Sequence, residues 1–356
     1  MPPDGKAVGA VLASFNTNLG DLSSSLWRLI GFSETINDIW FRGRNSYPQL
    51  YDYQHAIAYE DRGGLILVSK LASGPDAWKQ LSSKMAAMTA TGPSLTARAL
   101  VSRMDALHPL INATGLLDIG CGTGSIISHI LDTYASSLPK TCTLIAADYS
   151  PDMVASTKAL RSKRLTAAQS NTPTAGVWSS LAVHELDAHD TSSAIVDCSL
   201  SHVLAGHVYF LLANPQKALH DTYRALTVNG ILAISVGHQA AHADALEAAI
   251  ECVKPGSRFS MLFPPWNSEV GIKVELETCG FVDIETFVVE EEMPFDDIQD
   301  FAKTLMWLPV VKNVVQGWEE REKDTLIREV MKELEARVQE GGKLGVSSIV
   351  ALAWKR

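Results

Sequence analysis

The chain lacks the cysteine pattern of a disulfide-stabilised or zinc-binding protein. Its five cysteines are scattered, form no CxxC pair and stand near no histidine at zinc-finger spacing. Such a set fits reduced thiols in a reducing compartment, so we expect a cytoplasmic protein. The N-terminus carries one lysine before a short apolar stretch and has no clear small-residue cleavage site, which argues against a signal peptide.

Long apolar runs and an excess of basic residues are also missing. No stretch approaches the roughly 18 consecutive apolar residues of a spanning helix, so we expect no membrane span. Asp and Glu number 40 against 30 Lys and Arg, a formal charge of −10, which disfavours a surface that follows a phosphate backbone. With 46% hydrophobic residues among 356, the chain can nevertheless bury a sizeable core.

Between about residues 115 and 237, short β-branched runs alternate with helical patterns, which predicts a parallel sheet covered by helices on both faces. The expected strands are 116–119, 143–147, 183–186, 195–200 and 231–236, and the expected helices are 125–133, 151–161 and 215–226. Further along we expect a helix at 240–253, a strand at 281–290, a helical stretch at about 296–339 and a strand at 346–354. Before residue 115, a largely helical segment over 74–110 follows a turn and short strand near 63–68.

The strongest motif lies in residues 116–125 (LLDIGCGTGS), where an apolar strand ends in an acid and a glycine-rich turn before a helix. Glycines let the backbone approach a ligand closely, and the helix N-terminus offers free N–H groups. A Walker loop is disfavoured because no lysine follows Gly124, and the dinucleotide pattern GxGxxG is not met. Asp118 would repel a pyrophosphate, and it suits a ligand that carries an ammonium group.

This motif resembles the first motif of the class I S-adenosylmethionine-dependent methyltransferases. Residues 215–235 resemble the helix, turn and strand of the small-molecule branch related to the ubiquinone/menaquinone-biosynthesis enzymes, with Asn229 in place of the usual first glycine of the turn. The resemblance covers about residues 75–356. It implies a Rossmann-like α/β fold, with a mostly parallel seven-stranded sheet, helices on both faces and a helical cap. It also implies S-adenosyl-L-methionine as the cofactor.

The resemblance implies cofactor contacts at the ends of successive strands. Asp118 stands in the first motif, and Asp148 ends the second strand, where a carboxylate can accept hydrogen bonds from both ribose hydroxyls. Asp187 and Ala188 match the adenine-binding positions after the third strand. The remaining expected contacts are Gly120, Cys121, Gly122, Tyr149, Met153 and Ser199. A plain strand-end acid at 148 and a solvated charge cluster at 185–190 remain the alternatives.

The expected chemistry is in-line displacement of a methyl group from a sulfonium. The protein must align the acceptor, exclude water and, where needed, remove a proton. In the resembled superfamily the end of the fourth strand faces the reacting methyl, and His202 is the expected general base there because an unperturbed imidazole titrates near neutrality. A structural histidine is the alternative, and His207 and Tyr209 follow closely. No constellation of side chains predicts a metal site.

The chain is longer than one cofactor-binding sheet requires. We expect a mainly helical N-terminal cap or extension over 1–110 and the methyltransferase domain over 111–356, with a helical cap insertion at about 291–345. Residues 263–266 (FPPW) resemble the Pro-Pro-aromatic motif of DNA amino-methyltransferases but lie beyond the fifth strand rather than after the fourth. They are therefore expected to form a pocket-lining loop or a rigid turn.

The expected function is methyl transfer to an O, N or C atom of a small, largely apolar metabolite, as in enzymes that tailor natural products in secondary metabolite biosynthesis. The expected partner is a small-molecule substrate without nucleic acid, and a homodimer is left open. One alternative is a pseudo-methyltransferase, which keeps the cofactor site but catalyses a cyclisation or rearrangement or acts as a regulator. A nucleic-acid methyltransferase is the other, and the acidic balance counts against it.

Overall fold

The computed structural model describes most of the chain from residue 93 onward and short segments before it. The described residues are 49–53, 56–61, 64–69, 78–79, 81–83, 85, 93–167, 172–257, 259–262, 264–295, 297–338 and 342–356. The chain divides into two compact units, Met1–Gln49 and Leu50–Arg356, and the second is described below. None of the helices in the described segments is both long and apolar enough to cross a membrane.

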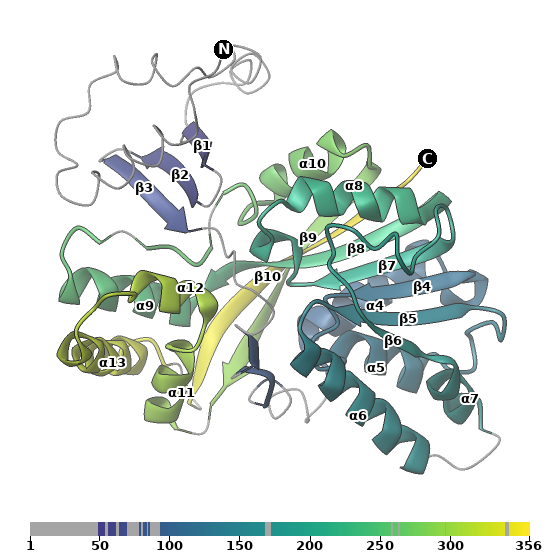
Figure 1. Cartoon of the computed structure of the whole chain (residues 1–356), viewed down its shortest axis with the longest axis horizontal. Coiled ribbons are helices and arrows are strands. Elements are labelled where there is room, and N and C mark those ends of the chain that lie inside the picture. Colours follow the sequence, from purple (N-terminus) through teal and green to yellow (C-terminus); the bar gives the residue numbers. More distant parts are fainter. Residues whose placement is uncertain are drawn as a thin grey trace. The chain divides into compact units, whose positions relative to one another are not determined.

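The centre of the fold is a seven-stranded sheet in the order β6-β5-β4-β7-β8-β10-β9 (Figure 1). Its strands are β4 (Gly115–Ile119), β5 (Thr143–Asp148), β6 (Ala182–Glu185), β7 (Leu200–Gly206), β8 (Leu226–Ala240), β9 (Val282–Pro294) and β10 (Lys343–Trp354). The first five pair in parallel, whereas β10 runs antiparallel to both β8 and β9. The expected mostly parallel sheet of a Rossmann-like methyltransferase is confirmed.

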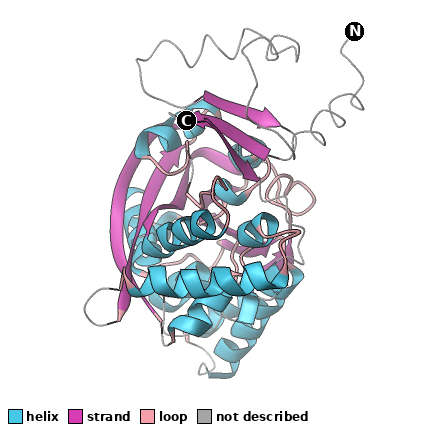
Figure 2. Ribbon diagram, turned by 90° about the vertical axis from the view of Figure 1, so that its left-hand side faces the viewer, coloured by secondary structure: helices cyan, strands magenta, loops and turns pink. Residues whose placement is uncertain are grey.

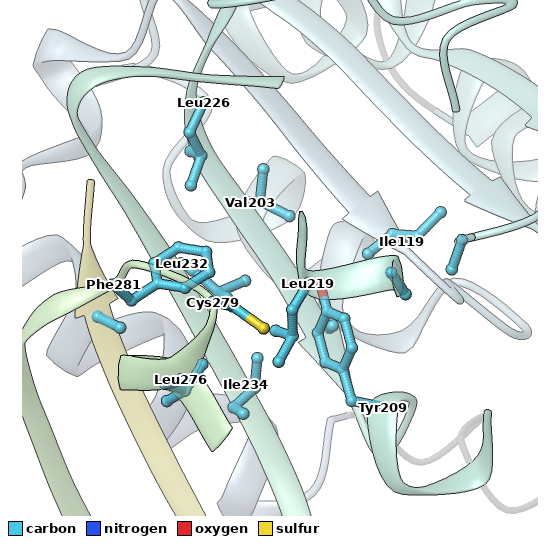
Figure 3. Close-up of a cluster of buried hydrophobic side chains, with 14 of the residues drawn as sticks. Ile119, Val203, Tyr209, Leu219, Leu226, Leu232, Ile234, Leu276, Cys279 and Phe281 are labelled. Carbon is cyan, nitrogen blue, oxygen red and sulfur yellow. The ribbon is translucent and has the colours of Figure 1, made fainter. Parts of the chain in front are cut away.

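Helices lie beside the sheet in Figure 2, and each face of the sheet has its own apolar cluster. The helices along the sheet are α4 (Leu95–Leu107), α5 (Ser125–Thr133), α6 (Pro151–Ala167), α7 (Pro173–Ser180), α8 (Pro215–Ala225) and α10 (Glu269–Thr278), with short 3-10 turns at Leu110–Asn112 and Tyr209–Leu211. Alternate residues of β8 point to opposite faces, as the pleat requires. Thus Leu232 and Ile234 pack with Leu219 and Leu276 (Figure 3), whereas Ile231 packs in the other cluster.

The cap is formed by helices at the carboxyl end of the long strand β8. Helix α9 (Ala241–Val253) follows β8 directly, and α11 (Ile298–Leu305), α12 (Pro309–Val314) and α13 (Glu320–Glu335) connect β9 to β10. Their buried faces form a third apolar cluster that includes Leu246, Val311, Leu326 and Val330. The helical stretch expected at about 296–339 is thus three helices. Because β8 ends at the same edge as the other parallel strands, this cluster extends the core beyond the sheet's carboxyl edge.

The described part of the N-terminal segment differs from the expected helical character. Strands β1 (Gln49–Tyr53), β2 (Ala56–Asp61) and β3 (Gly64–Ser69) form a small sheet in that order. The short strand expected near 63–68 coincides with β3. The expectations for residues 1–48 lie outside the described residues, so the boundary proposed near residue 110 stays a prediction.

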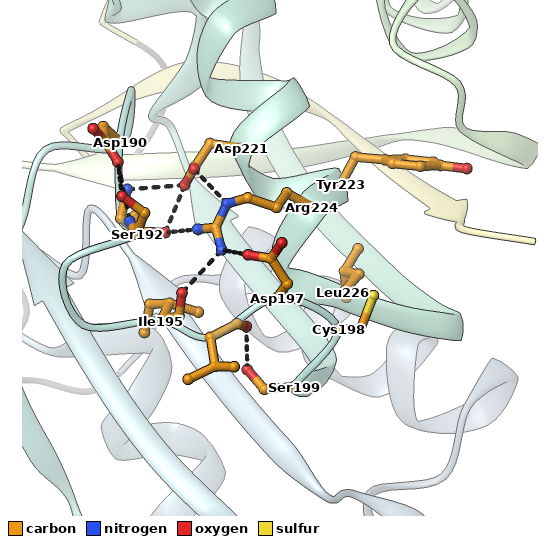
Figure 4. Close-up of polar contacts among 12 residues, drawn as sticks. Asp190, Ser192, Ile195, Asp197, Cys198, Ser199, Asp221, Tyr223, Arg224 and Leu226 are labelled. Carbon is orange, nitrogen blue, oxygen red and sulfur yellow. Dashed lines mark hydrogen bonds and ion pairs between the residues drawn. The ribbon is translucent and has the colours of Figure 1, made fainter.

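The fourth parallel strand lies later in the chain than expected. The β-branched run at 195–200 was predicted as a strand, but β7 begins only at Leu200, and Val196 is 72% exposed. Arg224 holds the preceding loop instead, because its guanidinium donates to the carbonyl of Ile195 at 2.9 Å and pairs with Asp197 at 2.6 Å (Figure 4). These polar contacts replace a strand ladder, and the carboxyl end of the strand moves to Gly206.

Candidate cofactor and acceptor site

The glycine turn after β4 leaves open space beside its backbone. Gly120, Gly122 and Gly124 all have positive φ, at 66°, 55° and 88°, a conformation that favours glycine. A Cβ added at Gly120 would lie 2.4 Å from Cγ2 of Val208, whereas one added at Gly122 would meet nothing within 4 Å. The turn therefore needs glycine at 120 for close packing, and at 122 it presents bare backbone to an open region.

Asp118 is buried at the end of β4 and has an unused acceptor. The residue is 1% exposed, and Oδ2 accepts a 3.1 Å hydrogen bond from the N–H of Ile127 in α5. Among the described residues, its buried Oδ1 has no hydrogen-bond partner. Burial raises the pKa of this carboxyl to about 7. A buried acceptor without a donor is costly, and the ammonium group of a ligand would satisfy it.

Asp148, at the end of β5, is joined to the glycine turn by hydrogen bonds. Its Oδ2 accepts from the N–H of Gly122 at 2.8 Å, and its Oδ1 accepts from the N–H of Ser150 at 2.8 Å. The N–H of Cys121 also donates to the carbonyl of Ala147 at 2.9 Å. Burial raises the pKa of Asp148, and the backbone hydrogen bonds act in the opposite direction. Each carboxylate oxygen keeps a further lone pair for a ligand hydroxyl.

The expected adenine-side residues lie on the neighbouring strand and helix. The N–H of Leu186 donates to the carbonyl of Asp148 at 3.0 Å, which places the loop after β6 beside the end of β5. Met153 in α6 is 3% exposed and Ala188 is 8% exposed, whereas Tyr149 is 45% exposed. Residues predicted from three separate segments are thus brought to one edge of the sheet.

Asp187 is held by a short chain of hydrogen bonds. Its Oδ1 lies 2.6 Å from Nδ1 of His189, and Nε2 of the same ring accepts from the N–H of Asn214 at 3.3 Å. Because a backbone N–H can only donate, Nε2 is the acceptor and Nδ1 carries the proton. Asn214 caps the N-terminus of α8, so the loop after β6 is anchored to that helix.

His202 and Ser199 lie at the opposite edge of the sheet from the glycine turn, so their positions do not support the expected base role of His202 or the expected cofactor contact of Ser199. His202 pairs with Leu116 at the start of β4, and its fully buried ring stacks on His108 with centroids 4.3 Å apart. Nε2 donates to the carbonyl of His108 at 2.9 Å, and burial lowers the pKa of His202 to about 4. Ser199 precedes β7, where its carbonyl would lie 2.7 Å from a Cβ added at Gly115. The cause is the late start of β7.

The carboxyl end of β7 carries His207 and Val208 instead. The N–H of His207 donates to the carbonyl of Ser235 in β8 at 2.9 Å, and Val208 packs against Gly120. The sequence signal for this strand end is the end of the apolar run at Gly206. The strand expected at 195–200 concealed it, because it placed the carboxyl end too early. The FPPW segment contributes Trp266, which is buried and stacks on Tyr209 with ring centroids 6.4 Å apart. It serves as packing beside β8.

Glu291, in the acidic run at 290–292 of β9, joins the strand to helix α4. Its carboxylate accepts from the N–H and from Oγ1 of Thr96 in α4, at 3.2 and 3.3 Å. This places a negative charge at the first turn of α4, which is favourable there. In the described segments, His, Cys, Asp and Glu form no group of three or more that could hold a metal ion.

The fold and the site together define a Rossmann-like protein of the class that binds S-adenosylmethionine. A family model described as "Methyltransferase domain" matches residues 117–232. "Methyltransferase ucsB" from Acremonium sp. is 31% identical over 238 residues, which cover 67% of this chain and 80% of that protein. "Methyltransferase tpcH" from Aspergillus fumigatus is 25% identical over 257 residues, which cover 69% and 83%. This chain belongs to the class I S-adenosylmethionine-dependent methyltransferases.

A structural comparison finds phosphoethanolamine N-methyltransferase 2 from Haemonchus contortus, which is 15% identical with a TM-score of 0.45. That match covers 82% of this chain and 62% of the other, so this chain spans less than two thirds of that structure. The cofactor of the present protein is S-adenosylmethionine. Its described residues fit this cofactor, because Asp118 leaves a buried acceptor unused and Gly122 faces open space.

Proposed function

We propose that this protein transfers a methyl group from S-adenosylmethionine to an O, N or C atom of a small, largely apolar metabolite in natural-product biosynthesis. The observation that carries the proposal is the buried Oδ1 of Asp118, which has no hydrogen-bond partner among the described residues and lies beside the open glycine turn that Asp148 holds. Two curated relatives, from Acremonium and Aspergillus fumigatus, are named methyltransferases, and this supports the proposed methyl transfer.

Each end of the cofactor has a matching group in this arrangement. Asp118 receives the ammonium group, the bare backbone at Gly122 lies along the amino-acid portion, and Asp148 accepts hydrogen bonds from the ribose hydroxyls. The adenine contacts are Met153, Asp187 and Ala188, with Tyr149 at the exposed side of the ring and Gly120 and Cys121 completing the turn. When bound, the cofactor supplies a methyl group on a positively charged sulfur.

The cap supports a small, apolar acceptor. Phe295, Phe301, Met306 and Leu308 are only partly buried and pack against the apolar cluster of α9, α11, α12 and α13. Partly buried aromatic and thioether side chains make an apolar lining, and closure of such a lining excludes water from the reaction. The formal charge of −10 also favours a small molecule over a nucleic acid.

The test combines ligand binding with product detection. Calorimetry with S-adenosylhomocysteine is expected to show binding to the wild type and strongly weakened binding to Asp148→Ala. Incubation of the protein with methyl-labelled cofactor and metabolite extracts is then expected to yield a labelled small molecule by mass spectrometry, and Asp148→Ala serves as the inactive control. Binding without a labelled product from any extract would instead favour a pseudo-methyltransferase.

A further inference from the structure

The end of β7 presents a histidine whose position the reaction can use. We propose that His207 is the general base that removes a proton from the acceptor, and that the acceptor is therefore a weakly acidic hydroxyl such as a phenol or an enol. This inference rests on the proposed function, because it concerns the acceptor side of the same site. It replaces the base role that His202 cannot fill at the other edge of the sheet.

The backbone around His207 lies directly against the glycine turn. Val208 fills the space in front of Gly120, and a Cβ added at Gly206 would lie 2.5 Å from Cδ1 of Ile126 in the first turn of α5. Residues on both sides of His207 thus contact the segment that binds the cofactor. This closeness is what a group acting at the reacting methyl requires.

The conformation of His207 is strained and fixed. Its φ is +58°, a left-handed value that is uncommon for residues other than glycine. The N–H is tied to Ser235 at 2.9 Å, so the β8 backbone helps to hold this conformation. Strained residues persist where the surrounding structure holds them, and they cluster at functional sites.

The surroundings of the imidazole suit a neutral base. His207 is an exposed residue, yet desolvation by the neighbouring protein lowers its pKa, and the negative charge of Glu291 acts in the opposite direction. The ring of Phe210 stands edge-on to it with centroids 6.2 Å apart. A neutral imidazole that solvent can reach, with an aromatic neighbour, is able to accept a proton from an apolar hydroxyl compound.

The proposed step balances as a displacement with proton removal. The acceptor oxygen forms a bond to the methyl carbon with one of its lone pairs, and the carbon–sulfur bond breaks with its electron pair left on sulfur. The hydroxyl proton passes to the imidazole of His207 and from there to water. An acceptor without a proton on its attacking atom, such as a tertiary amine, would have no use for this base.

The first experiment needs no acceptor. Imidazole signals are followed by NMR against pH in complexes with S-adenosylhomocysteine and with S-adenosylmethionine, and His207→Asn identifies the His207 signal. Asparagine is chosen because it tolerates a positive φ. The sulfonium adds one positive charge near His207, so its titration midpoint is expected at lower pH with S-adenosylmethionine. Signals of His220, exposed on α8, serve as the control and are expected to stay unchanged.

The outcomes separate this inference from the proposed function. If neither ligand binds, the proposed function fails. If both bind and the His207 midpoint is the same in the two complexes, His207 does not face the sulfur and this inference is overturned. With an acceptor identified by labelling, His207→Asn is expected to lower kcat by about 10²- to 10⁴-fold while S-adenosylhomocysteine affinity stays within about twofold. An unchanged kcat would also overturn it.

Discussion

The N–H of Gly122 donates a 2.8 Å hydrogen bond to Oδ2 of Asp148, so the turn after β4 and the end of β5 form one unit. Oδ1 of the same carboxylate holds Ser150 at the start of α6. A single side chain thus fixes the turn, holds the residue that precedes the next helix and offers its remaining lone pairs to a ligand.

Asp148→Asn tests this double role. The amide keeps the shape of the side chain, but its NH₂ group is a donor and cannot serve both N–H groups and the ribose hydroxyls. Hydrogen bonds to a charged acceptor contribute about 1.5–3 kcal/mol, so we expect affinity for S-adenosylhomocysteine to fall by about 10- to 100-fold. Calorimetry measures this, with Asp152→Asn in the first turn of α6 as control. Wild-type affinity in Asp148→Asn would exclude the ribose role.

Asp118 predicts a pH dependence of cofactor binding. Burial raises its pKa to about 7 in the free protein, so the carboxyl is protonated below that pH. A ligand ammonium group favours the carboxylate, so affinity for S-adenosylhomocysteine is expected to rise from pH 5.5 to 7.5, by at most about tenfold for each pH unit below the pKa. Asp118→Asn should flatten this profile. A wild-type affinity that is independent of pH would contradict the assignment of Asp118 to the ammonium group.

The two glycines of the turn provide a matched pair. Gly122→Ala introduces a methyl group into open space at positive φ and is expected to lower the free energy of unfolding by about 1–2 kcal/mol. Gly120→Ala adds a contact at 2.4 Å with Val208 and should cost more. Urea unfolding compares the two. Because the ligand is expected to occupy the space beside Gly122, the Gly122→Ala variant should also bind S-adenosylhomocysteine more weakly. If both variants lose the same free energy of unfolding, Val208 moves aside without cost and the close contact at Gly120 is not important.

The buried ring of His202, which stacks on His108, predicts sensitivity to acid. The pKa of His202 is about 4 in the folded protein and about 6.5 in the unfolded chain, so the unfolded state binds the proton first. Stability from this group is complete above about pH 6.5 and falls as the pH drops toward 4, by about 3 kcal/mol at most. In urea unfolding, His202→Gln should lose less free energy of unfolding between pH 7 and pH 5 than the wild type, whereas His220→Gln should lose as much as the wild type. An identical loss in both variants would argue against the buried neutral ring.

Much of the fold could be predicted because its signals are local. The apolar run before Asp118 and the glycines after it specify a strand, a turn and a helix within a few residues. The same holds for Asp148, which follows an apolar strand directly. The β-branched residues at 195–200 show the limit of this reasoning. Their propensity favours a strand, but Arg224, far along the chain, holds this segment in a loop.

The sequence by itself determined the class of fold, the cofactor and the acids that end β4 and β5, because these features depend on neighbouring residues. Only the tertiary structure decided which histidine stands at the cofactor edge. A shift of five residues in the start of β7 moves a side chain by about 16 Å along a strand. It puts His202 at the far edge and His207 next to Val208, which packs against Gly120. Pairing with β4 and β8 sets that position, and pairing between distant segments leaves no local mark in the sequence.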